Sequence, residues 1–312
     1  DFILAPCDEN KIAELTKGIC SHYIGKNTPE QDKQLLTALG INSFPVVPNL
    51  TQDDIQVVSP VGKPTYEWGS TRLNSILQPL FNPLRGARYT FVYQSTKQNY
   101  TKFTIGDRVI HTDKNMYSMQ WYSKYSKSGE FQKTWGFGIC NGEVGEIVDI
   151  FKAGQLLFLD EVDPEPADFE YPQNIRDDST FTDMNGYFVV VKYYDYISAK
   201  NFYILYRCNE TEYDCNYGKS FSGDDLSKLA LFYAGTTHKL QGSQSKLIIS
   251  VLGDVNFKGF ITRNMMYTVY TRAEKLVFAL GSVANTPNSM LTRARKEVAE
   301  KGVYTIGELL NS

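Results

Sequence analysis

The 312-residue sequence lacks the features of a membrane protein and of a disulfide-stapled domain. No apolar run approaches the roughly 18 residues that a membrane-spanning helix requires. The five cysteines are odd in number and scattered, without CxxC or Cys/His ligand spacing, which argues against zinc sites and disulfide frameworks. No signal peptide is recognisable, so we expect a reduced, cytoplasmic, soluble protein with no metal site and no membrane partner.

The sequence also lacks an excess of positive charge. Its 32 basic and 35 acidic residues give a formal net charge of −3. A protein covered by nucleic acid is usually basic, so any contact with nucleic acid must be local here. The length and the hydrophobic content of 42% are enough to bury the core of one large or two smaller domains.

Alternating strand-like and helix-like segments at both ends of the chain predict an α/β class. The apolar residues 2–7 have the character of a buried strand, and helical spacing follows them. Thr28 and Pro29 combine a capping residue with a proline, which predicts that a second helix starts there and ends at Gly40. After residue 229 the same alternation returns, so we expect a sheet with parallel pairing.

The middle of the chain is β-rich and punctuated by glycines. We therefore predict one α/β domain of residues 1–95 and 225–312, interrupted by a β-rich insertion of residues 96–224. Short strands in the insertion suggest a small barrel, and residues 186–208 suggest a two-stranded ribbon. A final helix is expected from Thr286, which is a capping residue followed by proline.

The stretch YAGTTHKLQG places a polar turn between two apolar runs, at a position where open α/β sheets bind ligands. Gly242 would let the backbone approach a phosphate or ribose closely. Thr236 and His238 offer donors to a phosphate backbone, and Gln241 can hydrogen-bond in both directions. A capped turn with a satisfied histidine explains any one of these residues, but their combination favours a binding site.

Arg272 lies in the second segment of interest, MMYTVYTRAEKLVFALGS, near the end of an expected helix. A lone arginine at this place is usually a solvated charge that the helix dipole favours. A guanidinium near a γ-phosphate would instead neutralise transition-state charge, which is worth roughly 10³–10⁵ in rate, or about 4–7 kcal/mol.

Together the two segments resemble motifs V and VI of superfamily 1 helicases of the RecD-like branch. That branch includes the alpha subunit of exodeoxyribonuclease V, TraA-type relaxase-helicases and phage Dda. The matching positions are Tyr233, Ala234, Thr236, His238, Lys239, Gln241 and Gly242 in the first segment, and Tyr267, Thr268, Thr271, Arg272, Ala273 and Gly281 in the second. The segment TYEWGSTRLNSILQPLFNP is similar to a family helix, and IGDRVIHTDKN and NGEVGEIVDI are similar to signatures of its SH3-like barrel.

The resemblance implies a second RecA-like domain, a parallel sheet with helices on both faces, with an inserted SH3-like barrel. It also implies that Arg272 is the arginine finger on the γ-phosphate of ATP. Gln241, Gly242 and Gln244 would lie at the nucleotide cleft, where Gln244 replaces the glutamate that the family usually has and so loses a charge. The residues expected to contact single-stranded DNA are Thr236, His238 and Lys239.

An aromatic and basic excursion at residues 115–138 departs from the family pattern because it is longer than the usual link between the barrel signatures. Trp121 and Tyr122 could stack on bases, and Lys124 could pair with a phosphate. An extended hairpin that packs its aromatic side chains on the barrel explains the same residues equally well.

The sequence contains no phosphate-cradling loop of the form G-x-x-x-x-G-K followed by Ser or Thr. The resemblance places that loop and the acidic metal-holding motif in an N-terminal RecA-like domain of the same protein, which would hold most of ATP and Mg²⁺. We therefore expect the C-terminal part of a 5′-to-3′ DNA helicase, inactive as an ATPase alone, acting on single-stranded DNA or a single-strand/double-strand junction.

Three alternatives stay open. The chain could be the helicase half of a conjugative relaxase or a subunit of a recombination-repair exonuclease. It could also be an ATPase-dead scaffold that binds nucleic acid, although such a scaffold needs neither Arg272 nor the pair formed by Gln241 and Gly242.

Overall fold

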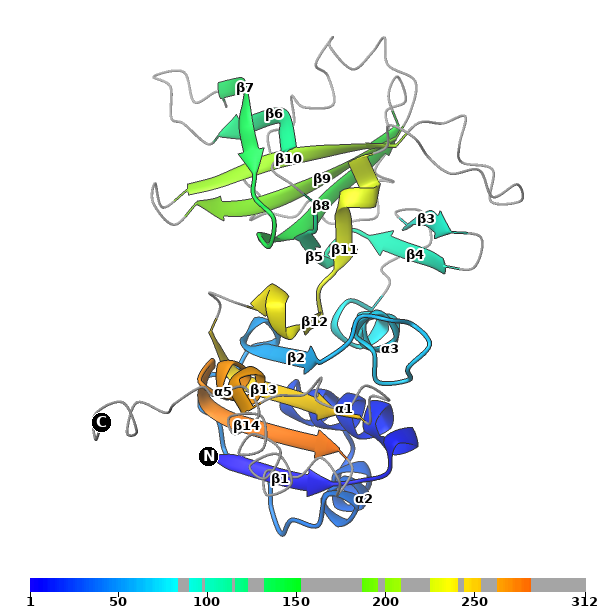
Figure 1. Ribbon diagram of the computed structural model, residues 1–312, viewed down its shortest axis with the longest axis vertical. Helices are drawn as coiled ribbons and strands as arrows, with labels where there is room; N and C mark the ends of the chain where they lie inside the picture. The colour runs from blue at the N-terminus through cyan, green and yellow to red at the C-terminus, as the bar shows by residue number, and fades with distance from the viewer. Residues whose placement is uncertain are drawn as a thin grey trace, which may run out of the picture. The chain divides into compact units, whose positions relative to one another are not determined.

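The computed structural model describes residues 1–83, 90–96, 99–113, 116–122, 132–152, 187–195, 200–208, 225–240, 244–253 and 263–281 (Figure 1). The chain forms two compact units. The first comprises Asp1–Phe81 and Tyr233–Ser312, and the second comprises Asn82–Phe232. The final helix expected from Thr286 lies outside the described residues.

A five-stranded parallel sheet forms the centre of the first unit, in the order β1-β14-β13-β2-β12. The strands are β1 (Phe2–Pro6), β14 (Ala273–Gly281), β13 (Ser245–Leu252), β2 (Ile55–Ser59) and β12 (Ala234–Thr236). All five residues of β2 are buried, as expected for a parallel strand that is covered on both faces. The predicted α/β class with parallel pairing is confirmed.

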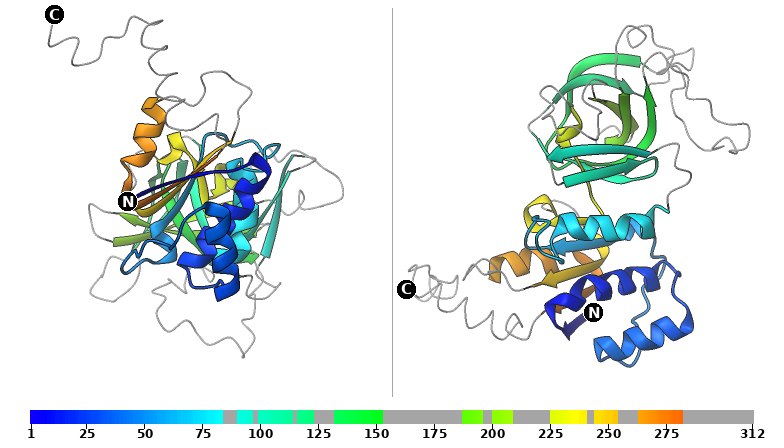
Figure 2. Two further views of the ribbon diagram at one scale, coloured as in Figure 1. Left: turned by 90° about the horizontal axis from the view of Figure 1, so that it is seen from below. Right: turned by 90° about the vertical axis from the view of Figure 1, so that its right-hand side faces the viewer.

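Helices cover both faces of this sheet (Figures 1 and 2). On one face, Tyr23 of α1 (Glu9–Tyr23) meets Phe278 of β14 with ring centroids 6.1 Å apart. Phe278 pairs with Ile249, so the neighbouring Ile248 points to the opposite face. There Ile248 lies beside Val269 of α5 (Arg263–Tyr270). Side-chain alternation along the strands therefore assigns each residue of the sheet to the α1 face or the α5 face.

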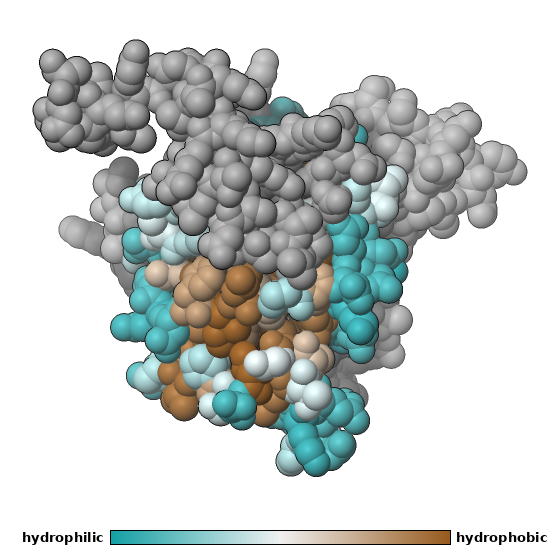
Figure 3. Space-filling view, turned by 60° about the horizontal axis from the view of Figure 1, so that its bottom comes forward, coloured by the Kyte–Doolittle hydropathy of each residue, from teal (hydrophilic) through white to brown (hydrophobic). Residues whose placement is uncertain are grey.

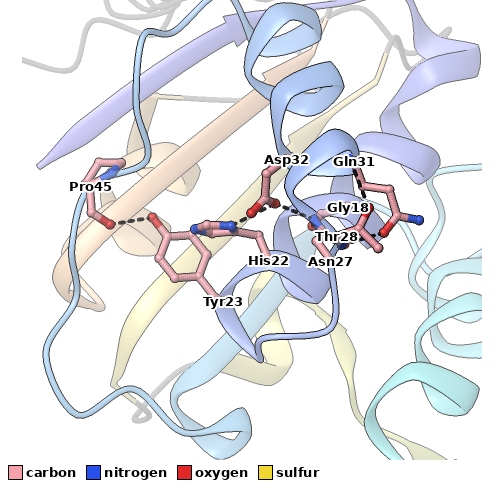
Figure 4. Close-up of polar contacts among 8 residues, drawn as sticks. All are labelled: Gly18, His22, Tyr23, Asn27, Thr28, Gln31, Asp32 and Pro45. Atoms are coloured by element: carbon pink, nitrogen blue, oxygen red, sulfur yellow. Dashed lines mark hydrogen bonds and ion pairs between the residues drawn. The ribbon is translucent and has the colours of Figure 1, made fainter.

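Helix α2 (Pro29–Leu39) is held against α1 by polar contacts (Figure 4). The Nδ1 atom of His22 lies 2.9 Å from Asp32 Oδ1, and Asn27 Nδ2 donates to the same oxygen at 2.8 Å. Thr28 forms the predicted N-terminal cap, and Gly40, with φ of 69°, ends the helix as predicted. The sequence signals at both ends of α2 are thus confirmed.

Helix α3 (Ser70–Phe81) contains Pro79 and continues past it to Phe81. Proline lacks the backbone N–H that a helix interior needs, and α3 ends two residues after Pro79. Phe81 stacks on Tyr233 with ring centroids 5.5 Å apart. This contact fixes α3 beside the start of β12.

The second unit is built on a seven-stranded antiparallel sheet in the order β11-β5-β8-β9-β10-β6-β7. Figure 2 shows its strands curving around a common interior. The strands are β5 (Arg108–His111), β6 (Met116–Tyr122), β7 (Gln132–Ile139), β8 (Val144–Lys152), β9 (Tyr187–Asp195), β10 (Lys200–Cys208) and β11 (Leu229–Leu231). A separate pair consists of β3 (Thr90–Thr96) and β4 (Asn99–Thr104).

The predicted two-stranded ribbon is β9 and β10, which pair along their whole length. The sheet differs from an isolated ribbon, because β9 also pairs with β8 and β10 also pairs with β6. Val189, Val190 and Val191 are all fully buried, so β9 is an inner strand and cannot stand alone as a ribbon. The predicted domain boundaries at residues 95 and 225 stay predictions.

The segments IGDRVIHTDKN and NGEVGEIVDI of the second unit each begin with a tight turn. Gly142 has φ of 96°, a left-handed conformation that favours glycine, and its N–H donates to the His111 carbonyl at 2.9 Å. Asp107 accepts the Thr104 N–H at 2.7 Å and an Asn82 Nδ2 proton at 2.8 Å. Both turns therefore fix the ends of strands in the antiparallel sheet.

Hydrophobic side chains remain exposed at the edge of the first unit, along β1. Phe2 is 47% and Leu4 37% exposed, and the space-filling view shows hydrophobic residues gathered in one area between hydrophilic flanks (Figure 3).

Among the described residues, no helix is long and apolar enough to cross a membrane, and no group of three or more His, Cys, Asp or Glu could hold a metal ion.

Candidate functional site

A small pocket lined by both polar and apolar residues lies on the α5 face of the parallel sheet. Its lining residues are Gln56, Val58, Thr237, Ser245, Ile248, Thr268, Val269 and Arg272. Side chains from the sheet strands β2 and β13, from α5 and from the 3₁₀ turn Thr237–Leu240 meet there. Arg272 is the one predicted site residue in this lining.

Backbone hydrogen bonds at the end of α5 fix the position of the Arg272 backbone. The Arg272 N–H donates to the Val269 carbonyl at 3.2 Å, and the Arg272 carbonyl accepts the Ser245 N–H at 3.0 Å. Thr271 Oγ1 donates to the Tyr267 carbonyl at 2.8 Å, which satisfies a helix-end acceptor. The arginine therefore stands at a defined junction between helix and sheet, not on a loose loop.

The start of β12 is fixed from the other side by Asn74 of α3. Asn74 Oδ1 accepts the N–H groups of Tyr233 and Ala234, both at 2.8 Å, and its Nδ2 donates to the Ala234 carbonyl at 2.9 Å. These bonds place the short strand β12 and the turn that follows it, which brings Thr237 over the sheet.

Two buried polar atoms in the pocket lack partners. Thr237 is 5% exposed, and within the described part of the chain neither its Oγ1 nor Arg272 Nε has a hydrogen-bond partner. A buried polar atom without a partner costs about 1–3 kcal/mol. No acidic side chain is among the pocket-lining residues, so nothing in the lining neutralises the guanidinium. The pocket is therefore electropositive, with hydrogen-bonding capacity left over.

The residues predicted to contact DNA lie beside this pocket but face elsewhere. Thr236 pairs with Ser59, whereas Gly235 pairs with the pocket residue Val58, so Thr236 points to the α1 face. His238 is exposed, and Lys239 is partly buried, which lowers the pKa of its ammonium group by desolvation. The turn thus separates Thr236 from Arg272 by sheet face.

The other predicted site residues are not brought into this pocket. Gln241 and Gly242 lie outside the described residues, and Gln244 is exposed just before β13. Trp121 and Tyr122 are on strand β6 of the second unit, and Lys124 lies outside the described residues. The nucleotide and DNA roles of these residues stay predictions.

Sequence reasoning missed Thr237, Gln56, Ser245 and Thr268. Thr237 falls at a position that the helicase-like pattern leaves unspecified, between Thr236 and His238. Thr237 begins the 3₁₀ turn that follows β12, and its place in the pocket depends on how that turn packs on the sheet, for which the sequence carries no local signal.

Comparison with known proteins finds no matching family model and no matching curated protein. Solved structures of Pif1 helicases are similar to this chain at low TM-scores. The Pif1 helicase from Candida albicans has a TM-score of 0.38 and 12% identity, with 93% of this chain and 57% of that chain covered. Pif1 from Bacteroides bound to ssDNA gives 0.36, 12%, 93% and 55%, and the Bacteroides complex with ADP-AlF3 and ssDNA gives 0.35, 12%, 95% and 55%. The chain spans about 55–57% of the length of these helicases.

Proposed function

We propose that this chain is the C-terminal part of an ATP-dependent superfamily 1 DNA helicase, in which it supplies Arg272 to the terminal phosphate of the nucleotide. The observation that carries the proposal is the unsatisfied hydrogen-bonding capacity of the Arg272 guanidinium. Its Nε is buried and has no partner among the described residues, at the junction of α5 and β14.

An arginine with a purely structural role would be expected to pair with a carboxylate or with backbone carbonyls. A planar guanidinium with donors to spare instead suits phosphate, whose oxygens accept two parallel N–H bonds. The terminal nitrogens of the guanidinium would bind an acceptor from outside the described residues. The proposal therefore assigns the opposite wall of the nucleotide site to an N-terminal RecA-like domain of the same protein.

In this proposal the residues of this chain would form one side of an ATP site. Arg272 would contact the phosphates, with Gln241, Gly242 and Gln244 as the proposed neighbours of the nucleotide. ATP with Mg²⁺ would be the substrate, and hydrolysis of its β–γ phosphoanhydride bond to ADP and phosphate would drive movement. Because the sequence contains no phosphate-cradling loop, most nucleotide and metal contacts are assigned to the N-terminal domain.

The DNA contacts are assigned to the other side of the same turn. Thr236 points to the α1 face, His238 is exposed, and Lys239 follows directly. A hydroxyl, an imidazole and an ammonium group offer sequence-independent donors to a single-stranded backbone. Strand β12 and its turn would then link the DNA side to the nucleotide side. The second unit is assigned as the SH3-like insertion, and the 5′-to-3′ direction is part of the same proposal.

The test is DNA-stimulated ATP hydrolysis by the full-length protein. Replacement of the guanidinium in R272A is expected to lower kcat by about 10³-fold or more. R272K should also be impaired, because an ammonium group keeps the charge but not the two-pronged geometry.

R72A is the matched control. Arg72 is a surface arginine on α3 that pairs with Glu67 at 3.1 Å, and its loss should leave the rate unchanged. Equal rates for R272A and the wild type would refute the assignment of Arg272. Normal ssDNA binding by R272A would show that the loss concerns the nucleotide step.

A further inference from the structure

Thr237 and Arg272 share one unusual property: each has a buried polar atom without a partner in the described part of the chain, and both line the same pocket. Isolated atoms of this kind can arise anywhere in a protein. Two in a pocket whose free space is about that of one water molecule suggest a common partner.

We propose that Thr237 is a positioning residue for Arg272 and that it acts through a water molecule bound in this pocket. The water would accept a hydrogen bond from the Nε–H group of Arg272 and form a second hydrogen bond with Thr237 Oγ1. This inference rests on the proposed function of Arg272, and it adds a residue that the helicase-like pattern does not specify.

The two unpartnered atoms are chemically suited to share one water molecule. A buried water typically needs two to four polar partners. Arg272 Nε can only donate, whereas a threonine hydroxyl can donate or accept, so one water can satisfy both. Ser245 and Thr268 also line the pocket. Val58, Ile248 and Val269 supply the apolar part of the lining.

The consequence for Arg272 concerns the orientation of its side chain. A guanidinium carries five N–H donors in a rigid plane, one on Nε and four on the terminal nitrogens. If Nε is anchored inward, the plane is fixed and the terminal nitrogens remain for a phosphate. A side chain oriented beforehand loses less entropy on reaching the reacting group. Thr237 would thus raise the rate without touching the nucleotide.

The kinetic test uses T237V, T237S and T37V in the full-length protein. Valine keeps the shape of threonine and removes the hydroxyl, so T237V should lower kcat for DNA-stimulated ATP hydrolysis by roughly 3- to 10-fold. The KM for ATP and the affinity for ssDNA should stay within about 2-fold, since the hydroxyl contacts neither ligand. T237S retains the hydroxyl and should restore the rate. T37V makes the same change at an exposed position of α2 and should have no effect.

A double-mutant cycle separates this inference from the function on which it rests. In the R272A background, T237V should cause no further loss, because the residue it orients is gone. An equal loss in both backgrounds would show that Thr237 acts independently of Arg272, and the inference would be wrong. If R272A itself has the wild-type rate, the proposed function fails instead.

A crystal structure of the protein provides a test that needs no activity. It should show an ordered water within hydrogen-bonding distance of Thr237 Oγ1 and Arg272 Nε, and T237V should lack it. A wild-type pocket that is dry, or a T237V variant that is more stable and fully active, would overturn the proposal. The latter result would mean that the hydroxyl is merely an unsatisfied group.

Discussion

Asn74 and Ala234 are 160 positions apart in the sequence, yet the Asn74 amide bonds to both backbone groups of Ala234. Its Oδ1 accepts the Ala234 N–H at 2.8 Å, and its Nδ2 donates to the Ala234 carbonyl at 2.9 Å. The same Oδ1 accepts the Tyr233 N–H. One buried side chain of α3 thus takes the place of a neighbouring strand for the short edge strand β12.

The N74A variant is therefore expected to destabilise the attachment of β12. It would leave two N–H groups and one carbonyl without their side-chain partner, at a cost of about 2–4 kcal/mol. Hydrogen exchange followed by mass spectrometry should show faster exchange in the peptide that contains residues 233–240. N42A, at an exposed position before β2, provides the control and should exchange as the wild type does. Unchanged protection of that peptide in N74A would mean that β12 is held by other contacts.

Gly253 follows β13 and lies directly against the indole ring of Trp68. A Cβ added at Gly253 would come within 1.9 Å of the ring, which is far inside van der Waals contact, and Trp68 is only 2% exposed. G253A should therefore lower the free energy of unfolding by roughly 2–4 kcal/mol, because the ring must move out of a packed site. Thermal unfolding detected by tryptophan fluorescence provides the measurement.

The matched control for that change is G62A. A Cβ at Gly62 would have its nearest neighbours at 3.7 Å, which is ordinary contact, so its melting temperature should stay close to that of the wild type. If G253A melts like G62A, the contact between Trp68 and Gly253 is looser than the structure indicates.

The ion pair between Asp54 and Lys246 predicts a pH-dependent term in stability. Lys246 Nζ lies 3.0 Å from Asp54 Oδ2, and the Thr51 N–H donates to the same oxygen at 2.8 Å. Burial of Asp54 alone would raise the pKa of its carboxyl, but the hydrogen bonds from Thr51 and the charge of Lys246 outweigh it and lower the pKa.

A carboxyl whose pKa is lower in the folded state stabilises the fold above its unfolded pKa of about 3.9, and this contribution is lost as the pH falls through the folded value. D54N should thus cost about 1 kcal/mol at pH 7, and the difference from the wild type should shrink below about pH 4. Urea unfolding at both pH values checks this. A difference that is the same at both would show that the charge of Asp54 is irrelevant.

Local signals predicted much of this fold. The cap at Thr28 and the stop at Gly40 were readable because helix ends depend on a few neighbouring residues. Apolar runs such as residues 247–252 indicated buried parallel strands for the same reason. The full sheet of the second unit was not readable, because the partners of β9 and β10 are β8 and β6, which come earlier in the chain.

The candidate site was predictable only in part. Arg272 was found because the residues around it form a pattern along the chain. Gln56, on β2, lines the pocket because the strand order of the sheet places β2 next to β13. Strand order is a property of the packed sheet, and the spacing of apolar residues along the sequence does not predict it.

The separation of Thr236 and Arg272 onto opposite faces of the sheet leads to a functional prediction. If Thr236 and His238 contact DNA, T236V and H238A should each weaken ssDNA binding by the full-length protein about 3- to 10-fold, the loss of one hydrogen bond. The kcat for ATP hydrolysis at saturating DNA should change little, since neither side chain lines the Arg272 pocket. R272A should show the reverse pattern, with normal ssDNA affinity and a greatly reduced kcat. Fluorescence anisotropy with a labelled oligonucleotide, together with ATPase assays on the same samples, separates the two effects. A loss of kcat at saturating DNA in H238A would place this histidine on the nucleotide side of the turn and contradict the division of roles between the two faces.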